Sequence, residues 1–200
     1  TASVIDTGNV TDMGYAFRNC NALKTVTLGN TDKLTVAQYM FANCRELETL
    51  PQINLSKVSK AQYVFQNCKA IKTTPDLDLS STTTAMNLFS GCSSLETVGK
   101  LTFTKVTSLV SMFSGCTNLK DVPVFNTSKV IGATGAFTGC DSLTDESLNN
   151  ILAMCANMTV FTETKNLVNL GLTTDITSRC QSLSNYQAFR NAGWKVYNEA

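Results

Sequence analysis

The stretch Met112-Phe113-Ser114-Gly115-Cys116-Thr117-Asn118-Leu119 has counterparts along most of the chain. Its phenylalanine and cysteine return every 24 residues, without insertion or deletion, at Phe17/Cys20, Phe41/Cys44, Phe65/Cys68, Phe89/Cys92, Phe113/Cys116 and Phe137/Cys140. An aliphatic residue stands three positions after each of these cysteines, at Leu23, Leu47, Ile71, Leu95, Leu119 and Leu143. A fixed period of this length is typical of solenoids, in which each repeat buries its apolar side against its neighbours.

Each repeat is predicted to contain two segments of different backbone conformation, here called the helical arm and the extended arm. Helical spacing places five apolar residues on one side of a predicted short helix, at Val58, Ala61, Val64, Phe65 and Cys68. The segment 47–55 predicts extended chain, because it contains Pro51 and ends on the alternating pair Ile53 and Leu55. Asn or Gly precedes every repeat cysteine, which predicts a left-handed turn there. We therefore expect an α/β solenoid, a right-handed curved rod of the leucine-rich-repeat class. Its parallel sheet is expected on the concave face and its short helices on the convex face.

The period ends after Leu143. Residues 1–143 are predicted to form the solenoid, as a partial repeat followed by six 24-residue repeats. Residues 144–200 are predicted to be degenerate repeats and a C-terminal cap, because the end of a solenoid must be covered. Thr144 is the expected N-cap of a first cap helix, with Asp145 and Glu146 in its first turn.

The composition removes several classes of function. The 16 Lys and Arg against 15 Asp and Glu leave a net charge of +1, so nucleic acid is not an expected partner. The absence of histidine removes His-based catalysis and imidazole metal ligands. No apolar run is long enough to cross a membrane, and Thr1–Val4 do not begin a signal peptide. We expect no enzyme, no metal and no cofactor.

Cysteines spaced 24 residues apart lack the close pairs of zinc sites. Stacked one per coil at ~4.8 Å, their Cβ atoms lie farther apart than the ~3.8 Å that a disulfide prefers. We therefore expect the six repeat cysteines to be reduced and buried.

Positions between the buried aliphatic residues of the extended arm face a shared concavity. These candidate ligand-binding residues are Thr49, Gln52, Thr73, Asp76, Thr97, Lys100, Asp121 and Val124. They vary from coil to coil while the core positions hold, which is consistent with a fixed scaffold and a specialised face. The alternative is that they are simply solvent-facing. A secondary candidate is the tyrosine column, Tyr15, Tyr39 and Tyr63, which can supply contact area and hydroxyls or merely cover a seam.

Met112–Leu119 and the segment Thr127-Ser128-Lys129-Val130 resemble the BspA-like bacterial surface leucine-rich repeats. The resemblance covers about residues 1–143. It implies a secreted or cell-surface adhesion and host-interaction protein that binds protein or glycan. Related repeats in phage and prophage proteins leave a tail receptor-binding or structural component as the alternative. The oligomeric state and the ligand itself stay open.

Overall fold

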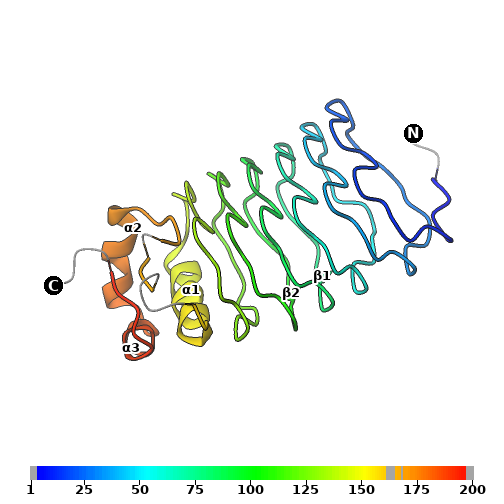
Figure 1. Ribbon diagram of the computed structural model, residues 1–200. Helices are drawn as coiled ribbons and strands as arrows, with labels where there is room; N and C mark the ends of the chain where they lie inside the picture. Colours follow the sequence, from blue (N-terminus) through cyan, green and yellow to red (C-terminus); the bar gives the residue numbers. More distant parts are fainter. Residues whose placement is uncertain (1–3, 161–164, 168, 197–200) are drawn as a thin grey trace.

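The computed structural model describes residues 4–160, 165–167 and 169–196. The chain winds into flattened coils stacked along an elongated rod, and the helices labelled α1, α2 and α3 lie at its C-terminal end (Figure 1). The leucine-rich-repeat solenoid that the sequence predicts is confirmed.

Parallel pairing between coils occurs along two lines. The strands β1 (Leu77–Asp78) and β2 (Leu101–Thr102) pair in register, and the bridges Thr73↔Thr97↔Asp121 extend this line. The second line consists of single bridges that join residues 24 positions apart, at Asp12, Val36, Lys60, Thr84, Ser108 and Gly132. Each coil therefore touches its neighbours through short pieces of extended chain.

The predicted repeat helices are wrong in their backbone conformation, because within residues 57–68 the structure has a bridge at Lys60 and turns over 62–67, and no helix. The N–H groups of Tyr63, Phe65 and Asn67 donate to carbonyls of the next coil, at 3.1, 3.0 and 2.7 Å. Those of Gln66 and Cys68 donate three residues back along their own coil. Three N–H groups that a helix would use internally are thus used between coils. The five apolar residues are buried as predicted.

In each repeat, the segment that was predicted to be helical contains two residues with left-handed φ. One is the Asn or Gly before the cysteine, as predicted, with Asn19, Asn43 and Asn67 at φ 57 to 65°. The other column has the φ values Tyr15 62°, Tyr39 58°, Tyr63 62°, Asn87 55°, Ser111 52° and Gly135 65°. Asn87 and Gly135 were the sequence signal for this second turn, because both residue types tolerate positive φ.

A stack of six phenylalanines runs through the repeats. Successive rings from Phe17 to Phe137 lie with centroids 5.1–5.9 Å apart and planes within 18° of parallel. Five of the repeat cysteines are buried beside this stack, at positions 44, 68, 92, 116 and 140. Each donates its S–H to the backbone of the preceding coil, as Cys68 does to the carbonyl of Phe41. The predicted burial is wrong for Cys20, which is exposed because no described coil lies on its other side.

The C-terminal helices are α1 (Asp145–Asn157), α2 (Thr174–Arg179) and α3 (Tyr186–Asn191), with a short 3-10 turn, η2 (Cys180–Ser182). The predicted cap at Thr144 is confirmed, because its hydroxyl accepts the Ser147 N–H at 3.2 Å. The buried Ser147 hydroxyl accepts from Val122 N–H and donates to the Lys120 carbonyl, both at 2.8 Å. A side chain of α1 therefore takes the place of the next coil's backbone.

Candidate functional site

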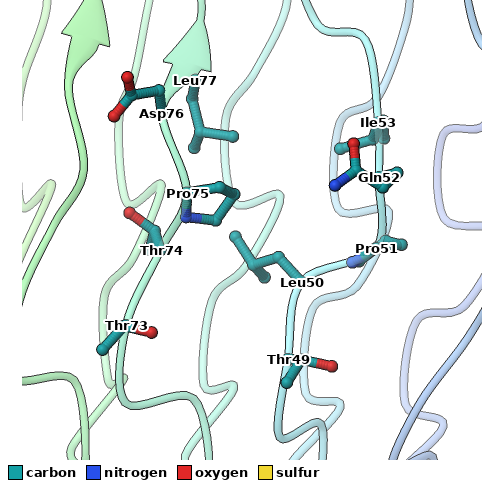
Figure 2. A pocket seen from close by; sticks show the side chains of 10 residues that line it. All are labelled: Thr49, Leu50, Pro51, Gln52, Ile53, Thr73, Thr74, Pro75, Asp76 and Leu77. Carbon is teal, nitrogen blue, oxygen red and sulfur yellow. The ribbon is translucent and has the colours of Figure 1, made fainter.

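The candidate site is a pocket between two neighbouring coils, here called the seam pocket. It encloses about 370 Å³ and is lined by residues 49–53 of one extended arm and 73–77 of the next. Figure 2 shows the side chains from the two arms around the hollow between them. Four of the eight predicted ligand-binding residues line it, namely Thr49, Gln52, Thr73 and Asp76.

The seam opens here because inter-coil hydrogen bonds are missing. The Glu48 N–H donates to the Lys24 carbonyl at 3.0 Å, and the Glu96 N–H donates to the Lys72 carbonyl at 2.8 Å. Within the described residues, no backbone hydrogen bond joins 48–53 to 72–77. Pro51 and Pro75 occupy equivalent positions in the two arms, and neither has an N–H to donate.

Glycine closes the next seam. Gly99 stands 24 residues after Pro75, and its N–H donates to the carbonyl and hydroxyl of Thr74 at 3.2 and 3.0 Å. A Cβ at Gly99 would lie only 2.5 Å from the Pro75 carbonyl carbon, so the two coils touch backbone to backbone. Proline in one coil and glycine in the next thus determine which seam opens.

The pocket lining is mixed in character. Thr49 and Thr73 supply exposed hydroxyls, Gln52 an exposed amide, and Pro75 an exposed ring. Asp76 contributes the single charge among the described lining residues. Its Oδ1 accepts the Lys100 N–H at 2.8 Å, which fixes the carboxylate and leaves its other oxygen for a ligand. The pocket can therefore hold hydroxyl or N–H donors against an apolar platform.

The other four predicted residues lie outside this pocket. Thr97 is part of the closed seam and bridges to both Thr73 and Asp121. Lys100 and Val124 are exposed, the latter by 56%. Asp121 lines a second hollow of about 320 Å³ beside Pro123 and the start of α1. The structure therefore brings together half of the predicted set.

Tyr15, Tyr39 and Tyr63 form a stack of their own and do not line the seam pocket. Their ring centroids lie 4.9 and 4.3 Å apart with nearly parallel planes, and the Arg18 guanidinium lies 5.6 and 5.2 Å from the first two centroids. Burial and the neighbouring Tyr63 raise the pKa of Tyr39. Because stacking uses the ring faces and the Tyr63 hydroxyl donates to Met86 Sδ at 3.4 Å, the ring edges remain for any partner.

Two searches of the described residues concern metal ligands and membrane-spanning helices. Residues 4–160, 165–167 and 169–196 contain no cluster of three potential metal ligands. The helices described are all too short and too polar to cross a bilayer.

The description "BspA type Leucine rich repeat region" belongs to a family model that matches residues 7–118 in six copies. The chain belongs to the BspA-type leucine-rich repeat family. A second model, described as a Mycoplasma protein of unknown function, DUF285, matches residues 72–175. The resemblance seen in the sequence is thereby confirmed.

Two solved structures resemble the chain. A leucine rich cell surface protein from Faecalibacterium prausnitzii A2-165 shares 27% identity, with a TM-score of 0.54, over 72% of this chain and 38% of that protein. The T. pallidum leucine rich repeat protein shares 18% identity, with a TM-score of 0.42, over 79% of this chain and 78% of that one. The BspA-type chain thus spans well under half of the Faecalibacterium protein. No curated protein matches its sequence.

Proposed function

We propose that this chain is a non-enzymatic binding module of a bacterial cell-surface or secreted protein, with a role in adhesion to a protein or glycan. The seam pocket carries the proposal, because it brings together four residues of the extended arms at positions where the residue type varies from coil to coil. Membership of the BspA-type family and the similarity to a leucine rich cell surface protein support the location.

The scaffold suits binding more than catalysis. The pocket's one carboxylate, Asp76, has no second acid, base or nucleophilic thiol among the described lining residues. A single fixed charge can orient a ligand, whereas acid–base catalysis needs a partner group within reach of the same atom. Recognition therefore accounts for the chemistry that this pocket offers.

The test begins with arrays of host proteins and glycans probed with the purified chain. For a ligand found in this way, Gln52→Ala and Asp76→Ala should each weaken binding about tenfold, which corresponds to ~1.4 kcal/mol. Lys100→Ala and Val124→Ala are matched controls, because these positions are equivalent to Asp76 in the next two coils but lie outside the pocket.

Equal losses from the controls would show that the whole arm binds and that the pocket has no special role. Losses from Tyr39→Ala without any from Asp76→Ala would place the ligand on the tyrosine column. The phage alternative is addressed by the gene's surroundings, since flanking tail-assembly genes would contradict a surface adhesin.

A further inference from the structure

The extended arms 72–77 and 96–101, one coil beyond the seam pocket, are joined by a regular set of backbone hydrogen bonds. The Thr74 N–H donates to the Thr97 carbonyl at 3.3 Å, and the Leu77 N–H donates to the Lys100 carbonyl at 2.8 Å. In return, the Thr97 N–H donates to the Lys72 carbonyl at 3.3 Å. In a parallel ladder, residues that face one neighbouring strand alternate with residues that face the other. Thr73, between two residues that bond to the next coil, therefore faces the seam pocket.

The equivalent groups across the seam pocket make none of these bonds. Twenty-four residues earlier, the two donors are the N–H groups of Leu50 and Ile53, and their expected acceptors are the carbonyls of Thr73 and Asp76. The return bond would join the Thr73 N–H to the Glu48 carbonyl. None of these backbone groups has a hydrogen bond among the described residues. The arms on both sides of the seam, and those of the coils beyond them, all lie within the described range 4–160.

Two open strand edges thus face one another across the pocket, on residues 48–53 and 72–77. An edge with free N–H and C=O groups is a template for a further strand. Each side contributes five consecutive lining residues, which span ~17 Å when extended. The seam therefore matches a segment of about five extended residues in length and in hydrogen bonding.

The middle of the arm restricts what can lie against it. The residues at this position in four successive coils are Pro51, Pro75, Gly99 and Pro123. Gly99 packs against the Pro75 backbone so closely that a Cβ would lie 2.5 Å from the Pro75 carbonyl carbon. A strand that lies against Pro51 in the same way needs glycine at its own middle position.

The position after the middle determines the charge. Lys100 follows Gly99, and its N–H donates to the Asp76 carboxylate at 2.8 Å. Asp76 is the single charge among the described residues that line the pocket. A basic residue that follows the glycine of an inserted strand would lie beside this carboxylate and pair with its second oxygen.

We propose that the seam pocket binds an extended peptide segment of a partner protein, inserted between the two coils as an additional strand. The segment has glycine at its middle, followed by lysine or arginine. Its carbonyls accept from the Leu50 and Ile53 N–H groups, and its N–H groups donate to the Thr73 and Asp76 carbonyls. The inference rests on the function proposed above, because it names the ligand class of the same pocket.

A glycan fits these observations less well. Sugar hydroxyls can bond to the side chains of Thr49, Gln52 and Asp76, but they have no fixed alternation of donors and acceptors. A polypeptide carries N–H and C=O groups at the same interval as the two open edges. Pairing of both edges therefore favours a peptide.

Amide hydrogen exchange, followed by NMR on the intact chain, tests the open seam first. In the free protein the amides of Leu50, Ile53 and Thr73 should exchange faster than those of Thr74 and Leu77, which are hydrogen bonded. Equal protection of both sets would mean that the seam is closed, and would overturn the proposal.

The probe is the peptide acetyl-Glu-Thr-Val-Gly-Lys-Leu-Thr-amide, which has the sequence of the arm 96–102. Titration to about 5 mM detects a dissociation constant of ~1 mM. At that affinity the peptide should slow exchange of the Leu50 and Thr73 amides ~sixfold, because only unbound protein exchanges. The control peptide acetyl-Lys-Thr-Thr-Pro-Asp-Leu-Asp-amide, from residues 72–78, should have no effect. No protection by the probe, or equal protection by the control, would overturn the proposal.

Closing the seam should remove the site. Pro75→Gly supplies an N–H that can reach the Leu50 carbonyl, as the Gly99 N–H reaches the Thr74 carbonyl at 3.2 Å. This variant should weaken probe binding at least about tenfold. Pro123→Gly is the matched control, because Pro123 holds the equivalent position outside the seam pocket, and it should leave binding unchanged. Full binding by Pro75→Gly would refute the seam as the site.

A charge exchange tests the second feature of the segment. Asp76→Lys should abolish binding of the probe and should bind the same peptide with glutamate in place of its lysine. Circular dichroism and the urea midpoint show whether the variant is folded. A folded Asp76→Lys that still prefers the lysine peptide would contradict the placement of a basic residue beside Asp76.

Failure of this inference is distinguishable from failure of the proposed function. A glycan that binds, loses affinity in Asp76→Ala and leaves the Leu50 and Thr73 amides unprotected would keep the seam pocket and overturn the inserted strand alone. Array ligands that bind independently of Gln52 and Asp76 would overturn the seam pocket as the site of both.

Discussion

Tyrosine at a left-handed position is the most unusual single-residue choice in this chain. For a residue with a Cβ, that conformation costs ~1–2 kcal/mol, and Tyr15, Tyr39 and Tyr63 all adopt it. Stacking between the rings recovers ~0.5–1.5 kcal/mol per pair. The backbone N–H of Tyr39 also reaches the carbonyl of Gln62 in the next coil. The strain is therefore balanced by contacts that exist only when coils are stacked.

The environment of each repeat cysteine also depends on the neighbouring coil. Burial raises the pKa of Cys44 to about 11 and that of Cys140 to about 12, whereas Cys20 is exposed. Because the thiolate is the reactive form, native protein treated briefly with iodoacetamide at pH 8 should be alkylated at Cys20 alone. Peptide mass spectrometry gives the readout, with urea-unfolded protein as the control in which all eight cysteines react. A disulfide between repeat cysteines would contradict the stacking of free thiols.

Packing between neighbouring arms depends on side-chain size at one repeated position. Gly99→Ala places a Cβ 2.5–2.8 Å from the backbone of Pro75 and Asp76, so one coil must shift. Overpacking of this kind costs ~1–3 kcal/mol, which chemical denaturation measures as a lowered midpoint. Gly132→Ala is the control, because its Cβ would meet nothing closer than 3.7 Å. Equal stability of the two variants would show that the coils on either side of Gly99 can shift apart without a loss of stability.

Helix capping offers a second matched pair. The Thr144 hydroxyl accepts the Ser147 N–H at the start of α1, whereas Thr173 at the start of α2 makes no side-chain cap hydrogen bond. Thr144→Ala should therefore lower the free energy of unfolding by ~1 kcal/mol, and Thr173→Ala by clearly less. Thermal or urea unfolding of both variants measures the difference. A larger loss from Thr173→Ala would contradict the capping assignment.

The rod as a whole should lose stability in alkali. The ordinary thiol pKa is 9.0, and burial raises it in the folded chain, to about 11 for Cys44. A raised folded pKa means that the neutral thiols contribute stability below about pH 9, and that this contribution is lost as the pH rises toward 11. Urea midpoints measured between pH 7 and 11 should fall in that window.

A control is needed because tyrosine and lysine titrate nearby. Cys68→Ala with Cys92→Ala removes two buried thiols whose pKa values burial also raises. The urea midpoint of this double variant should fall less steeply above pH 9 than the urea midpoint of the parent chain. An identical slope would mean that the thiols do not drive the alkaline loss.

The sequence by itself determined the period, the buried columns, the left-handed turn before each cysteine and the N-cap at Thr144. These features depend on residue type and spacing within one repeat or one helix end. Membership of the BspA-type family followed from the same residues. The division of the chain at residue 143/144 stays a prediction, although α1 begins at Asp145.

The tertiary structure alone decided the rest. Residues 57–68 have helical spacing, yet 62–67 form turns, because the N–H groups of Tyr63, Phe65 and Asn67 donate to carbonyls of the next coil. Thr49, Gln52, Thr73 and Asp76 come together, while Lys100 and Val124 stay apart, because Pro51 and Pro75 open one seam and Gly99 closes the next. A hollow of about 200 Å³ has both Ile131 and Trp194 in its lining, although they are far apart in the sequence. Such outcomes depend on contacts between chain segments 24 or more residues apart, which local residue patterns do not contain.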